Sequence, residues 1–186
     1  MNSNHDFCGS DVWREMVREQ IIPWALGDGV LGDDLLEVGP GFGATTEVFS
    51  ERVARLTAVE IDPRLAARLT ERFAGTNVEV VEGDATDLPF PDDRFSGATC
   101  FSMLHHVPGE ALQDRLFAEV ARVLRPGAAF VATDSLHSDD LRDFHEGDTY
   151  EPIDPAGLAD RLTAAGFRDV EVETNDYGWA ARARTA

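Results

Sequence analysis

The chain has 186 residues, 43% of them hydrophobic, so it can bury one sizeable core but is too short for two full domains. Its 35 acidic residues outnumber 16 basic residues, all of them arginine, and the formal net charge is −19. The acidic balance predicts neither nucleic acid nor a membrane surface as a partner, and the absence of lysine excludes a Walker lysine or a Schiff base.

The cysteines Cys8 and Cys100 lie far apart in the sequence and outside any metal-ligand spacing. We therefore expect two free thiols. No leader pattern opens the chain, and no apolar run is long enough to span a bilayer. These features predict a cytoplasmic protein.

Residues 1–10 are polar and have no period, which predicts a loose tail. From Asp11 onward, apolar side chains recur at helical spacing until Pro23, Gly27 and Gly29 end the pattern. Residues 11–31 should therefore hold an amphipathic helix. It could cover a sheet edge or form a lid over a ligand.

The next part of the chain alternates between strand and helix patterns. Strands are expected at residues 35–38, 56–61, 77–82, 95–101 and 128–133, and helices at 45–53, 63–73 and 112–123. Residues 134–155 have no clear period and predict a long loop or a small cap. A helix at 155–165 and two strands at 170–173 and 179–183, joined by a tight connection, follow.

This alternation predicts an α/β fold in a single domain, residues 1–186. We expect a Rossmann-like, seven-stranded, mostly parallel sheet with a C-terminal antiparallel hairpin and helices on both faces. Ligands bind such sheets outside the carboxyl ends of the strands, near the point where the strand order reverses. The residues at the strand ends can therefore be treated as one site.

The first strand runs directly into a glycine turn in LLEVGPGFGATT, residues 35–46. Gly39, Gly41 and Gly43 permit positive φ and a close approach of a ligand to the backbone, and the next helix offers free N–H groups. Glu60, at the end of the second strand, is placed to accept from the hydroxyls of a ribose. The turn alone is compatible with a dinucleotide or with another nucleoside cofactor.

Five segments in succession resemble the motifs of class I S-adenosylmethionine-dependent methyltransferases. They are EVGPGFG, AVEIDP, VVEGDATDLPFPDDRF, SMLHHV and RVLRPGAAFV, and the resemblance covers roughly residues 35–133. The GDA-x-x-LPF and LHHV segments most resemble the small-molecule group related to ubiquinone and menaquinone biosynthesis methyltransferases. The resemblance implies S-adenosylmethionine as cofactor, S-adenosylhomocysteine as product and transfer of a methyl group to a small-molecule acceptor.

The resemblance also implies roles for the residues at the strand ends. Glu37 would face the amino group of the cofactor's methionine, Glu60 would hold the ribose, and Asp84 would accept from the adenine amino group. The other implied cofactor-binding residues are Gly39, Gly41, Gly43, Ile61, Ala85, Phe101 and Ser102. Carboxylates suit this ligand because it carries a sulfonium and an ammonium and no phosphate.

The acceptor side is less defined. His105 and His106 are candidates for a general base if the acceptor must lose a proton; alternatively, one packs structurally and the other binds the backbone. The substrate-pocket candidates are Trp13, His137, His145 and Tyr150. The acids and histidines of residues 137–148 are irregularly spaced, so no metal site is expected.

Two other functions share part of the pattern. An NAD(P)-dependent Rossmann oxidoreductase shares the first strand–helix–strand unit, but the GDATDLPF segment, the terminal hairpin and the missing lysine disfavour it. A non-catalytic S-adenosylmethionine-binding module shares everything except the acceptor side. One departure from the family pattern is Ser96, which follows Phe95 where relatives usually carry aspartate.

Overall fold

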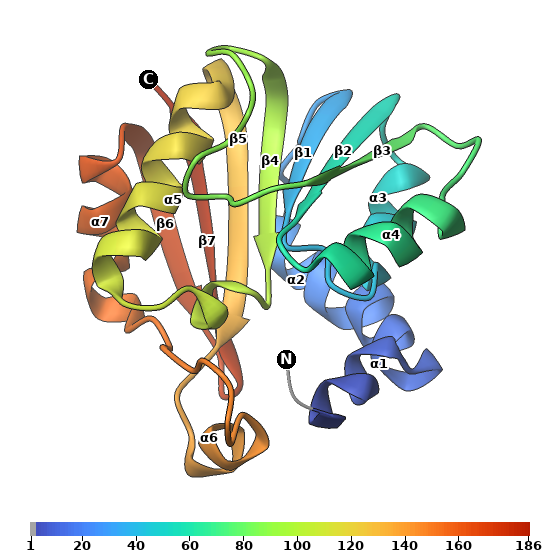
Figure 1. The fold of residues 1–186 in the computed structure, drawn as a ribbon. Coiled ribbons are helices and arrows are strands. Elements are labelled where there is room, and N and C mark those ends of the chain that lie inside the picture. Colours follow the sequence, from blue (N-terminus) through green and yellow to red (C-terminus); the bar gives the residue numbers. More distant parts are fainter. Residues whose placement is uncertain (1–2) are drawn as a thin grey trace.

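The computed structural model describes residues 3–186, and one seven-stranded sheet organises them in the order β3-β2-β1-β4-β5-β7-β6 (Figure 1). The strands are β1 (Asp34–Val38), β2 (Arg55–Glu60), β3 (Val78–Glu82), β4 (Phe95–Phe101), β5 (Leu124–Ser135), β6 (Phe167–Thr174) and β7 (Gly178–Thr185). The first five pair in parallel, whereas β7 pairs antiparallel with both β5 and β6. The predicted sheet and its terminal hairpin are confirmed.

Helices and short turns connect the strands. The α-helices are α1 (Asp11–Met16), α2 (Ile22–Leu26), α3 (Ala44–Ser50), α4 (Pro63–Arg72), α5 (Glu110–Val123), α6 (Asp139–Phe144) and α7 (Leu158–Ala164). A π-helix, η2 (Val17–Ile21), joins α1 to α2, and 3-10 helices occur at η1 (Ser3–Gly9), η3 (Leu104–His106) and η4 (Pro155–Gly157).

Alternate residues of the central strands point into two hydrophobic clusters, one on each face of the sheet. Leu36 joins one cluster together with residues of α5 and α7, while its neighbour Leu35 joins the other with residues of α2 and α3. Phe130 and Val131 of β5 divide in the same way. Because strand side chains alternate between faces, both faces of the sheet have to be covered by helices.

The N-terminal segment differs from the expected loose tail. Ser3–Gly9 forms the 3-10 helix η1, and His5 within it is only 4% exposed. Residues 1–2 of that expected tail lie outside the described residues. Figure 1 shows η1, α1 and α6 near the end of the sheet to which the arrows of β4 and β5 point. Segments far apart in the sequence thus meet beside the expected ligand site.

Ser96, which stands where relatives usually carry aspartate, links two strands. Its Oγ accepts from the backbone N of Asp34 at 2.9 Å and donates to the carbonyl of the same residue at 3.1 Å. The hydroxyl therefore ties the start of β4 to the start of β1. This contact lies at the amino ends of both strands, away from the ligand site.

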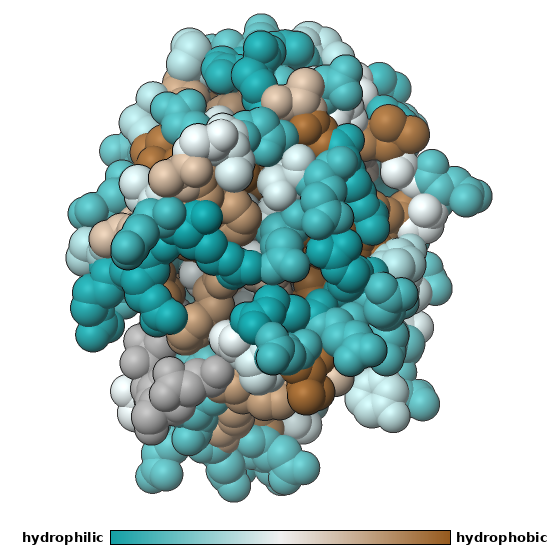
Figure 2. Space-filling model, turned by 90° about the vertical axis from the view of Figure 1, so that its right-hand side faces the viewer, coloured by the Kyte–Doolittle hydropathy of each residue, from teal (hydrophilic) through white to brown (hydrophobic). Residues whose placement is uncertain are grey.

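The surface is mainly hydrophilic. On the face shown in Figure 2, polar residues cover most of the area and apolar residues form small separate patches. Among the described residues, no helix combines the length and apolar character required to cross a bilayer.

Candidate functional site

Two neighbouring cavities, of about 330 and 240 Å³, lie at the carboxyl ends of β1, β2 and β4. Both are lined by Gly39, Ile61, Met103 and His106, so the two cavities are adjacent compartments of one site. The larger compartment also borders the N-terminal helices, and the smaller borders the loop after β3 and helix α5. This is the place where strand order reverses between β1 and β4, as the topology predicts.

The glycine turn forms part of the wall. Gly39 has φ of 66°, and a Cβ there would lie 2.8 Å from the side chain of Met103, so Met103 packs directly on this backbone. Gly41 has φ of 57° and open space where a Cβ would stand. Gly43 lines neither compartment and instead caps α3, where its backbone lies against Leu69 of α4. Two of the three predicted glycines therefore reach the site directly.

Glu60 borders the larger compartment and is 5% exposed. One carboxylate oxygen accepts from the backbone N of Gly41 at 3.0 Å, and the other accepts from the backbone N of Asp62 at 2.9 Å. Each oxygen has a second lone pair, so the carboxylate can still accept from a ligand hydroxyl. Glu60 thus joins the glycine turn to the end of β2.

Glu37 lies beneath the larger compartment without lining it. One of its oxygens accepts from the hydroxyl of Thr45, which does line the compartment, and the other oxygen is buried without a hydrogen-bond partner among the described residues. Burial is the main cause that raises the pKa of Glu37 to about 7; the nearby charge of Glu60 acts in the same direction, and the hydrogen bond from Thr45 opposes it. A carboxylate held in this way is suited to a cationic group above it.

The smaller compartment contains the residues expected at the adenine. Asp84, Ala85 and Ile61 all line it. Asp84 is exposed, and one of its oxygens accepts from both the backbone N and the hydroxyl of Thr86 at 2.8 and 2.9 Å. Ile61 is a large apolar side chain and is 67% exposed. A ligand ring lying over it would shield it from water.

Phe101 and Ser102, at the end of β4, line the larger compartment. Ser102 has φ of 52°, which is uncommon for a residue other than glycine. Its backbone N donates to the carbonyl of Thr133 at 2.8 Å, so β5 holds the residue in this conformation. The strained backbone turns the chain away from the sheet just at the cavity wall.

The two adjacent histidines occupy different environments. His106 lines both compartments, whereas His105 lines neither of them. Burial, together with the smaller effect of the neighbouring histidines, lowers the pKa of His106 to about 3, so its ring is neutral at pH 7. An imidazole of such low basicity is a weak general base.

His105 is instead part of a buried hydrogen-bonded chain. Its Nδ1 lies 2.7 Å from one carboxylate oxygen of Asp134, and its Nε2 lies 3.2 Å from Nε2 of His145. Nδ1 of His145 in turn lies 2.6 Å from the carbonyl of Leu141, to which it can only donate. These hydrogen bonds connect β5, the 3-10 helix η3 that follows β4, and the cap. They place His105 in a positioning role.

The structure divides the predicted substrate-pocket residues between two hollows. Trp13 lines the larger compartment, but His137, His145 and Tyr150 line a separate hollow of about 680 Å³ beside the cap. His137 is exposed, and the ring of Tyr150 stacks on His145 with centroids 4.7 Å apart. His145 nevertheless lies beside the larger compartment, because its ring centroid is 4.9 Å from that of His5, which lines it.

Several residues of the site had not been predicted. The additional lining residues of the larger compartment include His5, Cys8, Val17, Ile21, Met103, Asp148 and Thr149. His5 and Cys8 come from η1, and Asp148 and Thr149 come from the cap. Met103 lies inside the SMLHHV motif and could have been selected from it. The others come from segments without a motif, and only long-range packing brings them to the site.

Comparison with known proteins agrees with this geometry. Residues 36–132, just over half of the chain, match a family described as a methyltransferase domain. A Pyrococcus horikoshii protein of known structure has a TM-score of 0.76 at 19% identity and covers 95% of this chain and 92% of its own. A SAM-dependent methyltransferase from Methanosarcina mazei has a TM-score of 0.67 at 22% identity, with 89% and 97% covered. At these identities, the structural likeness shows the fold alone.

Curated relatives match shorter regions. A probable ribosomal RNA small subunit methyltransferase A of Thermococcus onnurineus is 43% identical over 32% of this chain and 22% of its own. The dimethyladenosine transferase of Schizosaccharomyces pombe is 40% identical over a match that covers 67% of this chain and 45% of that protein. The fatty-acid O-methyltransferase of Mycolicibacterium smegmatis is 36% identical over a match that covers 57% of this chain and 38% of that protein. The chain thus spans less than half the length of these relatives.

These relatives correct one expectation. The acidic composition predicted that nucleic acid is not a partner, yet many of the matching proteins are named as methyltransferases of ribosomal RNA. Net charge describes the whole surface on average and does not determine what one local site binds, whereas these matches are similarities of local sequence. The exclusion of nucleic acid from composition alone was therefore wrong.

Proposed function

The chain belongs to the class I S-adenosylmethionine-dependent methyltransferases, and we propose that it transfers the methyl group of this cofactor to a small-molecule acceptor in the larger compartment. The observation that carries the proposal is the two-compartment site at the reversal of strand order, with Glu60 at its floor and, among the described residues, no basic side chain in its lining other than histidine. Such a lining favours a sulfonium over a pyrophosphate.

The residues present fit the cofactor. The amino-acid end would lie over Gly39, Gly41 and Thr45, close to the buried oxygen of Glu37, and Glu60 would accept from the ribose. The adenine would occupy the smaller compartment, covering Ile61 beside Asp84 and Ala85. The methyl group would then face the part of the larger compartment that Phe101, Ser102 and Trp13 line. These assignments follow the family resemblance together with the cavity linings.

The bound cofactor supplies an activated methyl group with a good leaving group, so transfer is an in-line displacement at carbon. The acceptor atom would bond to the methyl carbon as the sulfur–carbon bond breaks, and the electron pair of that bond would stay on sulfur. The protein's main contribution is to align the acceptor opposite the sulfur. His106 lines the larger compartment and could take a proton from an acceptor that must lose one, although its weak basicity favours acceptors that are already deprotonated.

The size and apolar lining of the larger compartment support a small acceptor. Its wall includes Trp13, Val17 and Ile21 on one side and Phe101 on the other, so it is largely apolar. The fatty-acid methyltransferase among the relatives and the resemblance to quinone-biosynthesis methyltransferases agree with an acceptor of this kind. The ribosomal RNA methyltransferases favour a second candidate, a base of an RNA strand, which would have to enter the same compartment.

The experiment is an acceptor screen that measures release of S-adenosylhomocysteine. The panel should contain fatty acids, hydroxylated aromatics and quinol precursors in one arm and adenine-containing RNA oligonucleotides in the other. We expect turnover with members of the first arm. A matched reaction with the Glu60→Ala variant should lose turnover at subsaturating cofactor.

The outcomes separate the candidates. Turnover only with RNA would replace the small-molecule proposal with base methylation. Tight cofactor binding without turnover on any acceptor would favour a non-catalytic binding module. Absence of cofactor binding would remove the proposal altogether.

A further inference from the structure

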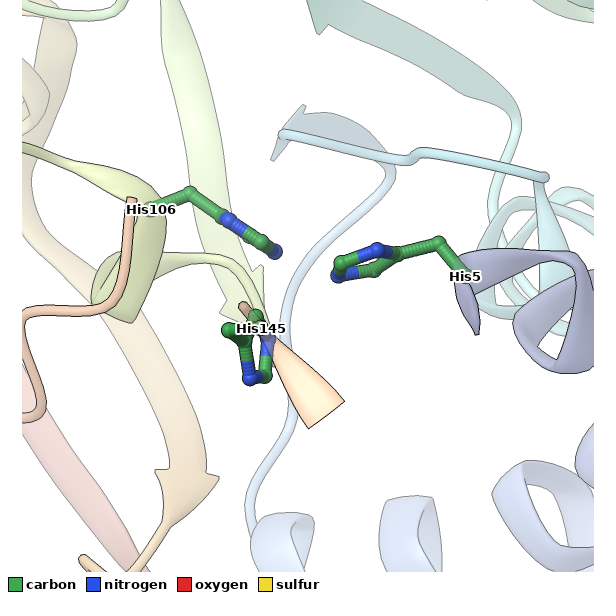
Figure 3. Close-up of side chains that lie close together, drawn as sticks. All are labelled: His5, His106 and His145. Atoms are coloured by element: carbon green, nitrogen blue, oxygen red, sulfur yellow. The ribbon is translucent and has the colours of Figure 1, made fainter. Parts of the chain in front are cut away.

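Three histidines from distant parts of the sequence meet beside the larger compartment. His5 comes from η1, His106 from the turn after β4, and His145 from the end of α6, and Figure 3 shows the three rings drawn together from separate segments. One nitrogen from each ring lies within 4.8 Å of those of the other two. The five histidines of the chain are thus unevenly distributed, because His105 touches the same cluster and only His137 stands outside it.

We propose that His5, His106 and His145 form a binding site for a divalent transition metal of the zinc class. Imidazole nitrogens suit zinc, cobalt, nickel and copper, whereas magnesium and calcium prefer oxygen ligands. Three histidines with a further open position are an established zinc arrangement. The proposal goes beyond methyl transfer and does not depend on it.

The contacts behind the rings are those that orient metal ligands. A ligating histidine commonly donates its other N–H to a carbonyl or a carboxylate. Nδ1 of His145 donates to the carbonyl of Leu141 at 2.6 Å, which makes Nε2 its ligand atom. Nδ1 of His5 lies 3.9 Å from a carboxylate oxygen of Asp148. One of the three rings is therefore already oriented by an oxygen acceptor, and a second has a carboxylate close to its Nδ1.

His105 supports the same site. Its Nδ1 is held by Asp134, and its Nε2 lies 3.2 Å from Nε2 of His145. With metal–nitrogen bonds of 2.0–2.1 Å, neighbouring nitrogens of a tetrahedral site are about 3.3 Å apart. His105 is therefore placed to act in one of two ways. It completes the tetrahedron as the fourth ligand, or it gives up its hydrogen bond to His145 when Nε2 of His145 binds the metal.

Closing the site requires a small movement. The nitrogens of the trio must approach from up to 4.8 Å to about 3.3 Å. His5 belongs to a short 3-10 helix at the start of the described chain, and His145 lies at the end of the six-residue helix α6. A metal would join the N-terminal segment, the cap and the end of β4 beside the compartment that His5 and His106 line.

The test is metal binding by the full chain without a histidine tag, after treatment with a chelator. Equilibrium dialysis against Zn²⁺ followed by elemental analysis should give one tightly bound ion per chain. His5→Ala and His145→Ala should each weaken the affinity by at least about 100-fold. His137→Ala is the matched control, because it removes the one histidine outside the cluster, and its affinity should equal that of the wild type.

A second readout guards against variants that fail to fold. Co²⁺ should give visible absorption bands of a tetrahedral nitrogen site in the wild type and in His137→Ala, and these bands should be lost in His5→Ala. Circular dichroism of the metal-free proteins should show the same secondary structure in all of them. Wild-type affinity retained in both His5→Ala and His145→Ala, or equal loss in His137→Ala, would overturn the site, as would failure of the folded wild type to bind Zn²⁺ at all.

Discussion

At the scale of single residues, the carboxylate of Glu60 has two roles, one in the structure of the turn and one in ligand binding. It accepts from the backbone of Gly41 and Asp62, and it presents its remaining lone pairs to the larger compartment. Replacement with alanine removes a charge-assisted acceptor and releases the turn. We expect Glu60→Ala to weaken S-adenosylmethionine binding by about 1.5 to 3 kcal/mol, measured by calorimetry.

Glu82 offers the matched control for this substitution. It pairs with Glu60 in the register of β2 and β3, but it is exposed and lines neither compartment. Glu82→Ala removes the same charge from the neighbouring strand end and should leave cofactor affinity unchanged. Equal losses in both variants would mean that general charge, and not the contact made by Glu60, controls binding.

Glu37 makes folding depend on pH. Burial raises its folded pKa to about 7 from an ordinary value of 4.5, so its contribution to stability is present below pH 4.5 and is lost as the pH rises through 7. The loss should be about 3 kcal/mol. Urea unfolding of the wild type and of Glu37→Gln should show a difference that changes in favour of the variant between pH 5 and pH 7.5.

The same comparison contains its own check. Glutamine keeps an acceptor for the hydroxyl of Thr45 and cannot ionise, so the other carboxyl groups of the chain titrate equally in both proteins. A wild type and a variant whose free energies of unfolding run parallel over this pH range would show that Glu37 titrates normally in the fold.

How far the sequence predicts the site depends on how local each signal is. Gly39, Gly41, Glu60 and Phe101 lie at strand ends inside motifs, so topology alone brings them to the lining of one compartment. His5 could not be predicted in the same way, because nothing near it in the polar N-terminal sequence indicates burial. Its position depends on contacts with residues about 100 and 140 positions away.

At the scale of elements, the unit β1–turn–α3 depends on Gly43. Its φ of 79° is in the left-handed region, and a Cβ would lie 2.6 Å from Leu69 of α4. Gly43→Ala should therefore destabilise the protein by about 2 to 4 kcal/mol through backbone strain and overpacking. Denaturant unfolding measures this loss.

Gly127 separates the two causes. Its φ of 76° is nearly the same, but nothing lies within 4 Å of its Cβ position. Gly127→Ala should show only the backbone strain, about 1 kcal/mol. If both variants lose the same stability, the contact between the turn and α4 contributes nothing.

The order of elements was predictable because hydrophobic periodicity is a local signal. The sheet and the hairpin follow from it, and α3, α4 and α5 begin and end close to the expected residues. The N-terminal helix and the cap were less predictable. The segment expected to be helical at 11–31 is helical only from Asp11 to Leu26 and contains the π-helical segment η2, and the cap contains α6, a helix too short to produce a clear period.

At the scale of the whole molecule, the net charge of −19 opposes the compact state. Salt screens this repulsion over a Debye length of about 10 Å at 0.1 M and about 3 Å at 1 M. We expect the midpoint of urea unfolding to rise steadily as NaCl increases over this range. A midpoint that falls or stays constant would mean that the ion pairs of the fold outweigh its excess negative charge.

The central claim is that the two-compartment cavity binds S-adenosylmethionine, and binding can be measured directly. Calorimetry of the full chain with S-adenosylmethionine, S-adenosylhomocysteine and NAD in parallel tests whether the site accepts a sulfonium nucleoside or a dinucleotide. The acidic floor of the site predicts micromolar-range binding of the first two, with Kd on the order of 1–100 μM, and no binding of NAD. Binding of NAD without binding of S-adenosylmethionine would contradict the account.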